Sequence, residues 1–271
     1  MSNKLRLVAF NILEGLRPVK PVDDERRMVD RDRAGAVLSV IDELKPDFLV
    51  LNEALYCRLY TGKKVDYGKL LGFPYETSSL YDNEWGNAIL SRHPIAKSSE
   101  MRIYNRGGMI AEIETPEGAV TITSYHPHPG RYPENKAEDF TALVEGQTGP
   151  LIICGDFNSI SPDDPIDRPQ MIKAFQAFSD NGEATLDQFL ESGGKVFGAL
   201  RKLGFDDAIP PAGRRYSIPT DLLSLDKASA MRVDHILVNK EVKVISGEVV
   251  QSDATNQASD HHPVMIDFSL I

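Results

Sequence analysis

Short apolar runs recur along the chain, and six of them end in, or adjoin, a side chain that can bind a metal ion or carry a proton. Apolar runs bounded by polar or turn-forming residues are typical of buried β-strands. Loops at strand ends are where functional side chains gather. The pattern therefore predicts a sheet-based fold with a site at the strand ends. The side chains concerned are Asn11, Glu53, His126, Asp156 with Asn158, Asp234, and Asp260 with His261.

The first third of the chain predicts a strand, a helix and a second strand. Residues 5–11 and 47–53 are short, mostly apolar runs that end in a polar residue, as buried strands do. Between them, apolar residues recur at helical spacing, and Pro46 prevents this helix from continuing past Lys45. The apolar positions of the helix are Ala34, Val37, Leu38, Ile41 and Leu44.

The rest of the chain mixes hairpins with further strands and helices. Residues 116–118 supply a turn between 109–115 and 119–126, which predicts an antiparallel hairpin. Residues 134–145 predict a helix, and 169–203 predict short helical segments separated by glycine-rich breaks. Hairpins in both halves favour two packed sheets with helices outside, of class α/β (α+β), over a single doubly wound sheet. The other predicted strands are 86–92, 150–158, 232–239, 242–250 and 264–270.

Length and composition predict one compact domain over residues 1–271. Hydrophobic residues make up 41% of the chain and charged residues 26%, a composition that supports a packed core. No repeat, low-complexity tract or Gly/Ser linker divides the sequence. No apolar run approaches the roughly 18 residues that span a bilayer, and the start lacks a signal-peptide core. We expect a soluble, cytoplasmic monomer without a membrane span.

The cysteines and the net charge bear on whether the protein has a disulfide and on whether it binds polyanions. Cys57 and Cys154 are the two cysteines, and Cys154 lies inside an apolar run, so we predict a buried structural thiol at Cys154 and no disulfide. The net charge is −10, from 30 Lys and Arg against 40 Asp and Glu. An acidic chain opposes tight sequence-independent binding to a polyanion, although a local basic groove is compatible with it.

The residue types at the strand ends suit phosphoester chemistry. Carboxylate and amide oxygens are the ligands that Mg²⁺ or Mn²⁺ accepts, and such an ion offsets charge on phosphoryl oxygens. Histidines move protons near neutral pH. Each residue also has a structural alternative: a turn for Asn11 and GDFNS, an Arg partner for Glu53, a salt bridge for Asp234, and a polar turn for SDHHP. A zinc site at His126 and His128 is disfavoured because no Cys or third His lies nearby.

Several segments, taken in order, closely resemble the endonuclease/exonuclease/phosphatase superfamily, which includes DNase I-like nucleases. The resemblance covers nearly the whole chain, and GDFN, RVDHI and SDHHP are its most specific parts. This sequence departs from the pattern of the superfamily at Asn52, where the superfamily commonly has Gln, and at Pro127, where an apolar residue such as Leu is usual. The matching segments are VAFNILEG, LVLNEA, GNAILSRHPI, TSYHPHPG, ICGDFNS, LGFDDA with YSIPT, RVDHILV and SDHHPV.

The resemblance implies a four-layer α/β/β/α sandwich with two mixed sheets and a Mg²⁺ or Mn²⁺ ion at one edge. By resemblance, Glu53 is the principal metal ligand, and Asn11 and Asp260 complete the site directly or through water. Asp156 and Asn158 orient the attacking water and bind the scissile phosphate. His261, held by Asp234, is the general base or a phosphate contact, and His126 stabilises the transition state or protonates the leaving group. The proton of the water goes to Asp156 or to His261.

Three functions fit these expectations. The first is a phosphodiesterase or nuclease, the second a phosphomonoesterase acting on a small metabolite or lipid headgroup, and the third an inactive binding module. The acidic net charge favours the second, whereas a nuclease needs a groove lined by cations and aromatic rings. Candidates for such a lining are Arg58, Lys63, Lys64, Arg102, Tyr104, Arg106, Arg131, Tyr132, Arg214, Arg215 and Tyr216.

Overall fold

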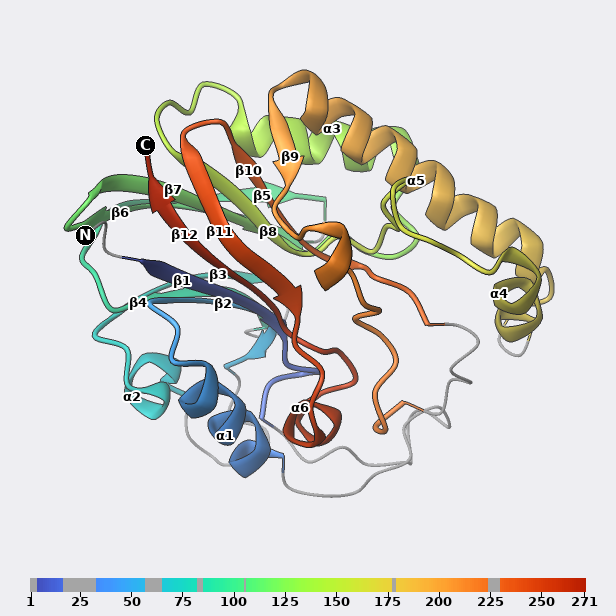
Figure 1. The fold of residues 1–271 in the computed structure, drawn as a ribbon, viewed down its shortest axis with the longest axis horizontal. Coiled ribbons are helices and arrows are strands. Elements are labelled where there is room, and N and C mark those ends of the chain that lie inside the picture. Colours follow the sequence, from blue (N-terminus) through green and yellow to red (C-terminus); the bar gives the residue numbers. More distant parts are fainter. Residues whose placement is uncertain are drawn as a thin grey trace.

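The computed structural model describes residues 4–16, 33–56, 65–81, 85–104, 106–176, 179–223 and 230–271. In these residues the strands form two six-stranded mixed sheets. The first sheet has the order β11-β12-β1-β2-β4-β3, and the second has the order β5-β6-β7-β8-β10-β9. Figure 1 shows the two sheets stacked between helices, with α3 and α5 along one side and α1, α2 and α6 along the other. The expected class, two mixed sheets flanked by helices, is confirmed.

The first sheet is built around the parallel pair β1 and β2, joined by α1. Asn11 at the end of β1 lies opposite Asn52 of β2. The helix α1 ends before Lys45, which has a left-handed φ of 49° just ahead of Pro46. Its buried face, Val37, Val40, Ile41 and Leu44, packs against the outer face of this sheet. The elements are β1 (Leu5–Asn11), α1 (Ala34–Leu44), β2 (Phe48–Leu55), α2 (Tyr67–Leu71), β3 (Tyr75–Tyr81), β4 (Trp85–Ser91), β11 (Val242–Val249), α6 (Asp253–Ala258) and β12 (Val264–Leu270).

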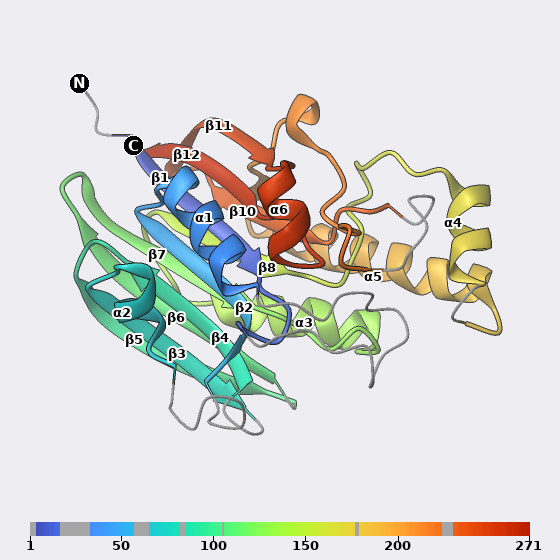
Figure 2. The same cartoon turned by 90° about the horizontal axis from the view of Figure 1, so that it is seen from below.

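The second sheet is built around the parallel pair β7 and β8, joined by α3. The predicted hairpin is present: β6 and β7 pair antiparallel, with Thr115 opposite Gly118. Figure 2 shows α3 and α5 running beside this sheet, with α4 beyond the far end of α5. The elements are β5 (Ile95–Ile103), β6 (Arg106–Thr115), β7 (Gly118–Tyr125), α3 (Pro133–Val144), β8 (Leu151–Asp156), α4 (Arg168–Phe175), α5 (Gly182–Lys202), β9 (Phe205–Asp207), the 3₁₀ turn η2 (Pro211–Gly213) and β10 (Asp234–Asn239).

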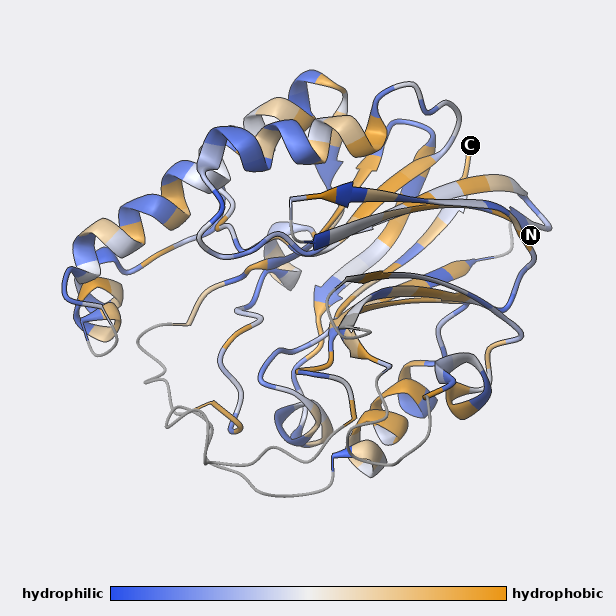
Figure 3. Cartoon of the chain, turned by 180° about the vertical axis from the view of Figure 1, so that it is seen from behind, coloured by the Kyte–Doolittle hydropathy of each residue, from blue (hydrophilic) through white to orange (hydrophobic). Residues whose placement is uncertain are grey.

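Apolar side chains fill both the space between the sheets and the spaces under the helices. Ile122 and Ile152 of the second sheet and Val50 of the first are fully buried in the cluster between the sheets. A second cluster joins Phe140 of α3 and Phe197 of α5 to the outer face of the second sheet. Figure 3 shows hydrophobic residues (orange) along the strands of both sheets, with hydrophilic residues (blue) interspersed along α5. This arrangement fixes the strand ends relative to one another.

One prediction about the helices is wrong. The segment 169–203 was expected to alternate short helices with glycine-rich breaks, yet Gly182–Lys202 is a single helix of 21 residues. Gly193 does not break the helix, because it serves close packing: a Cβ there would lie 1.7 Å from the backbone oxygen of Ile160. A glycine inside a helix is tolerated where only hydrogen fits.

Two further observations concern membrane-spanning helices and the cysteines. Among the described residues, no helix is both long enough and apolar enough to cross a membrane. Cys154 is a free thiol with no exposed surface, and burial raises its pKa well above the ordinary value. Cys57 lies outside the described residues, as do Arg58, Lys63 and Lys64.

Candidate active site

The strand register brings the predicted residues to one edge of the two sheets. Asp156, the last residue of β8, lies opposite Asp234, the first residue of β10. His126 follows the end of β7, which runs parallel to β8. Asn11 ends β1 in the other sheet, and its Nδ2 donates to Asp156 Oδ2 at 3.2 Å and to Glu53 Oε1 at 3.4 Å. Asn11 therefore links the acidic groups of the two sheets.

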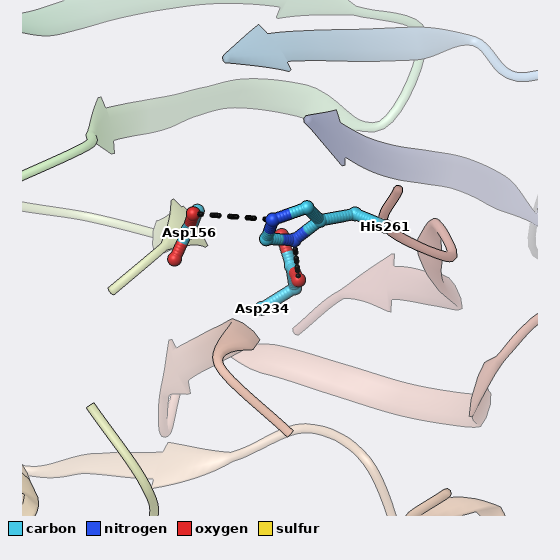
Figure 4. A group of neighbouring side chains, drawn as sticks. All are labelled: Asp156, Asp234 and His261. Atoms are coloured by element: carbon cyan, nitrogen blue, oxygen red, sulfur yellow. Dashed lines mark hydrogen bonds and ion pairs between the residues drawn. The ribbon is translucent and has the colours of Figure 1, made fainter. Parts of the chain in front are cut away.

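Two imidazoles flank the carboxylate of Asp156. His126 Nε2 lies 3.3 Å from Asp156 Oδ2, and His261 Nε2 lies 3.8 Å from the same oxygen. His261 Nδ1 contacts Asp234 Oδ2 at 2.7 Å, so Asp234 fixes the tautomer of that ring. Figure 4 shows His261 between the two carboxylates. All four side chains are buried. The result is a continuous His126–Asp156–His261–Asp234 array.

Burial and charge act on this array in opposite directions. Burial alone would raise the pKa of Asp156, but the neighbouring imidazoles of His126 and His261 hold that pKa well below its usual range. Burial alone would lower the pKa of His261, but the carboxylate of Asp234, followed by that of Asp156, raises it well above the usual value. At neutral pH the favoured state is therefore an ionised Asp156 carboxylate beside a protonated His261 imidazole.

Glu53 has a strained backbone conformation at the edge of the site. Its φ is +56°, in the left-handed region, and the β2–β4 register shifts between Leu51 and Ala54. For a residue other than glycine this conformation costs on the order of 1–2 kcal/mol, and such strain clusters at functional sites. The Glu53 carboxylate accepts from the backbone N–H of Glu14 at 3.0 Å as well as from Asn11. The bulge thus turns the carboxylate toward Asn11.

Asn52 joins the two sheets behind the site. Its Oδ1 accepts from the backbone N–H of Asp156 at 2.8 Å, and its Nδ2 donates to Asn87 Oδ1 at 2.8 Å. The side chain is completely buried. Gly155 makes this approach feasible, because a Cβ there would lie 2.8 Å from Asn52 Oδ1. Asn52, which departs from the common Gln, is therefore a structural support of Asp156.

Asn158 and Asp260 approach the pocket from two loops. Asn158 has a φ of +46°; its backbone N–H donates to Asp156 Oδ1 at 2.8 Å, and its Nδ2 donates to the carbonyl of Pro127 at 3.0 Å. The loop after His126 is thereby tied to the GDFN turn through Pro127. Asp260 is buried and accepts from Ser259 Oγ at 3.3 Å, while the same hydroxyl donates to the carbonyl of Asn11 at 2.6 Å.

The pocket offers ligand atoms suited to a hard cation. Asp156, Asp234 and His261 have potential ligand atoms within 4.8 Å of one another, so this group could bind a metal ion. Glu53 and Asp156 also converge on Asn11. Carboxylates that converge in this way favour positive compensation, and an oxygen-rich set fits a hard divalent ion better than zinc. His128 is exposed and accepts from the N–H of Gly130 at 3.0 Å.

The orientation of Asn11 bears on its predicted role as a ligand. Its Oδ1 accepts from the backbone N–H of Leu13 at 3.0 Å, so its Nδ2 faces the carboxylates. A direct bond from Oδ1 to a metal would require the amide to rotate. Contact through a water molecule needs no such rotation.

Two supporting residues escaped the sequence analysis. Arg33 is fully buried, and its guanidinium donates to the carbonyls of Leu13 and Gly15 after β1 and to that of Ala258 before Asp260. No sequence signal singles it out, because arginines are usually exposed. Lys136 is also buried and lies under the GDFN turn. It shares the apolar helix face with Phe140 and Leu143, a spacing that could have marked it.

The sequence profile of the Endonuclease/Exonuclease/phosphatase family matches residues 8–261 of the chain. The protein belongs to this family. The matched range runs from Val8 in β1 to His261 of the array, so it takes in the residues described above. No curated protein matches the chain at a comparable level of significance.

Solved structures agree with the family assignment at the level of the fold. An endonuclease/exonuclease/phosphatase from Beutenbergia cavernae is 18% identical, with a TM-score of 0.69, covering 98% of this chain and 72% of the other. The human Nocturnin catalytic domain with bound sulfate is 18% identical, with a TM-score of 0.62 and coverages of 99% and 94%. D. rerio TDP2 complexed with a single-strand DNA product is 16% identical, with a TM-score of 0.63 and coverages of 98% and 99%.

Proposed function

We propose that this protein is a Mg²⁺- or Mn²⁺-dependent phosphodiesterase that hydrolyses nucleotide-containing phosphodiesters. The observation that carries the proposal is the buried His126–Asp156–His261–Asp234 array beside the carboxylate of Glu53. Buried acid–base groups whose neighbours shift their pKa values are characteristic of active sites. Every position of the array holds a side chain able to carry a proton, which argues against an inactive binding module.

Glu53 is proposed as the principal metal ligand, with Asn11 and Asp260 completing the site directly or through water. A bound divalent ion would neutralise charge on the phosphoryl oxygens and stabilise the leaving oxygen. The carboxylate of Asp156 and the imidazole of His261 form the pair that receives the proton of the attacking water. Their nearest atoms lie 3.8 Å apart, and with Asp156 ionised and His261 protonated the carboxylate of Asp156 would be the member of the pair that takes the proton at neutral pH. Asp234 fixes the orientation of the His261 ring through its hydrogen bond with Nδ1.

His126 and Asn158 are proposed to act on the phosphate and its leaving group. His126 Nε2 faces the same carboxylate oxygen as His261 does, from the β7 side of the pocket. A protonated His126 would donate to a phosphoryl oxygen or to the departing oxygen. Asn158, fixed by its contacts with Asp156 and Pro127, would bind the scissile phosphate.

Two exposed aromatic rings, one after β5 and one in the loop between β7 and α3, favour a substrate that carries a base. Tyr104 and Tyr132 are 70% and 73% exposed. The guanidinium of Arg131 lies 5.2 Å from the centre of the Tyr104 ring, and it pairs with Asp139 at 2.8 Å through both nitrogens. Base stacking on exposed rings contributes on the order of 1–3 kcal/mol per base. These rings would hold a base next to the scissile phosphate.

The cations around the pocket support a short substrate over a long duplex. Arg131 is engaged by Asp139, Arg214 lies 3.7 Å from Asp207, and Arg106 is buried. Few of the predicted cations within the described residues are therefore free to track a phosphate backbone. The same observation, with the net charge of −10, supports a phosphomonoesterase as the second candidate.

The test is hydrolysis of bis(p-nitrophenyl) phosphate with Mg²⁺ or Mn²⁺, with and without a chelator, by the wild type and by Glu53→Ala and His261→Ala. We expect activity that the chelator and each substitution lower by at least about 100-fold. Activity indifferent to all three would overturn the proposal. p-Nitrophenyl phosphate under the same conditions separates the two candidates, because a phosphomonoesterase would prefer the monoester.

A further inference from the structure

Lys136 places an unusual charge behind the candidate active site. The residue lies in α3 and is 1% exposed, so its ammonium group is removed from solvent. Its Nζ donates to the carbonyl of Asn158 at 2.8 Å and lies 3.5 Å from Ser159 Oγ. No carboxylate of the described residues lies within ion-pair distance of it. A buried ammonium without an ion-pair partner is costly, so packing alone does not account for a lysine here.

Lys136 contacts the carbonyl of Asn158, which belongs to the peptide group that helps to set the orientation of this residue. Asn158 adopts a left-handed φ of +46°, while its N–H donates to Asp156 Oδ1 and its Nδ2 donates to Pro127. Its carbonyl points the other way, toward α3, where it meets Lys136. Hydrogen bonds to charged groups are about twice as strong as neutral ones. The ammonium therefore opposes rotation of this peptide out of the left-handed conformation.

Ser159, the next residue of the turn, makes contacts on the same side of the turn as Lys136 does. The carbonyl of Ser159 lies 3.0 Å from His235 Nε2, and Ser159 Oγ lies 2.7 Å from Ser192 Oγ of α5. Gly193 follows Ser192 and lets α5 approach the backbone of Ile160. Three elements, α3, α5 and β10, thus support the back of the turn, and Lys136 supplies the only one of these contacts that carries a full positive charge near neutral pH.

The electrostatics agree with this geometry. Burial lowers the pKa of Lys136 to about 8, while the negative charges of Asp156 and Asp139 act to raise it. The group therefore keeps its proton at neutral pH despite its burial, and its charge offsets part of the negative charge of Asp156.

We infer that Lys136 is a positioning residue, whose ammonium fixes the carbonyl of Asn158 and so holds the Asn158 side chain and the Asp156 carboxylate in place. This inference rests on the proposed function, because it assigns Lys136 to the same site. A residue that merely filled space would be replaceable by an apolar side chain of similar length.

The experiment compares the wild type with Lys136→Met, Lys136→Arg and the control Lys195→Met, using bis(p-nitrophenyl) phosphate with Mn²⁺. Met keeps the length of the side chain without a charge or a donor, and Lys195 is a partly exposed lysine of α5 that pairs with Glu134. We expect Lys136→Met to lower kcat about 30- to 100-fold with KM within about threefold, because a small misplacement of reacting groups costs rates of this size. Lys136→Arg should recover kcat to within about fivefold of the wild type, and Lys195→Met should match it.

A second readout does not depend on activity. Amide hydrogen exchange of residues 156–160 should accelerate in Lys136→Met and remain slow in Lys136→Arg, while the melting temperature of Lys136→Met stays at or above that of the wild type. Should Lys136→Met not fold, Lys136→Gln takes its place, since it keeps a donor without the charge.

The outcomes separate the inference from the proposed function. A wild type that hydrolyses no phosphoester defeats the proposed function, whereas an active wild type whose Lys136→Met variant keeps kcat within twofold defeats the positioning role alone. A loss of kcat in Lys136→Met that Lys136→Arg does not restore would also overturn the role, because it would indicate that the shape of the side chain matters and its charge does not.

Discussion

Asn11 Nδ2 lies 3.2 Å from Asp156 Oδ2, so the last residue of β1 in one sheet touches the last residue of β8 in the other. The two residues are 145 positions apart in the sequence. Their contact requires both sheets to present the same edge to one pocket. The proposed catalytic groups can act together only if this shared edge is present.

Asn52→Ala should lower both stability and activity, because it removes the side chain that receives the N–H of Asp156. The lost buried hydrogen bonds are expected to destabilise the fold by about 1–3 kcal/mol and to lower kcat roughly 10- to 100-fold. The control is Asn239→Ala, which removes part-buried hydrogen bonds to Leu151 and Gly149 at the other end of β8. Urea melts and steady-state kinetics should show similar destabilisation in both variants and reduced kcat in Asn52→Ala alone. Equal kcat in the two would contradict the role of Asn52.

Tyr132→Ala and Tyr104→Ala should weaken the binding of a dinucleotide substrate and leave bis(p-nitrophenyl) phosphate unaffected. Losing one stacked base is expected to raise KM for the dinucleotide about 5- to 100-fold. Tyr75→Ala is the control, because Tyr75 is also exposed, at 39%, and lies on β3 of the other sheet. Steady-state kinetics with both substrates measure the effect. Equal KM changes for the two substrates would rule out base stacking.

His235 should make the free energy of unfolding depend on pH below neutrality. Burial lowers its pKa to about 3, whereas the unfolded chain has a value near 6.5. Between these two values the unfolded chain binds the extra proton, so stability is fully present above about pH 6.5 and falls as the pH drops. The contribution lost over this window is on the order of 4 kcal/mol.

The measurement is urea unfolding of the wild type and His235→Gln at several pH values between 4 and 8. The difference in stability between them should shrink or change sign as the pH falls. His128→Gln, a substitution at an exposed position, should follow the wild type closely. A pH-independent difference between the wild type and His235→Gln would mean that His235 is not held neutral.

Gly193→Ala and Gly194→Ala should have opposite effects. A Cβ at position 193 would lie 1.7 Å from the Ile160 carbonyl oxygen, whereas a Cβ at position 194 has nothing within 4 Å. We expect Gly193→Ala to destabilise the protein by about 2 kcal/mol or more and Gly194→Ala to stabilise it by roughly 0.5–1 kcal/mol. Thermal unfolding measures both changes. Equal changes would show that α5 does not press on the turn after Asp156.

The sequence predicts much of this architecture, because the strands and α1 follow from local periodicity. The runs at residues 5–11 and 264–270 became β1 and β12 at the predicted bounds. The segment 232–239 also became a strand, but β10 begins at Asp234, so this carboxylate stands at the start of its strand. Pairing opposite Asp156 places it in the pocket nevertheless.

What the sequence does not predict depends on contacts between distant segments. Judged from local sequence alone, the glycines of α5 predict breaks in the helix. The helix is continuous, and the close packing of the Ile160 backbone against Gly193 explains why a glycine occupies that position. The bulge at Glu53 arises from pairing with β4, and the buried cations of Arg33 and Lys136 meet backbone carbonyls that no local pattern reveals. Tertiary packing decides these features, and it overrides local propensity.

The most direct test of the shared edge is the binding of Mn²⁺ by isothermal titration calorimetry, paired with the hydrolysis of bis(p-nitrophenyl) phosphate, in the wild type, Glu53→Gln and Asn239→Ala. The account predicts that Mn²⁺ binds the wild type and Asn239→Ala alike, and that Glu53→Gln loses at least about tenfold in affinity together with its activity. Wild-type affinity and turnover in Glu53→Gln would contradict the claim that these strand ends form one metal-dependent site.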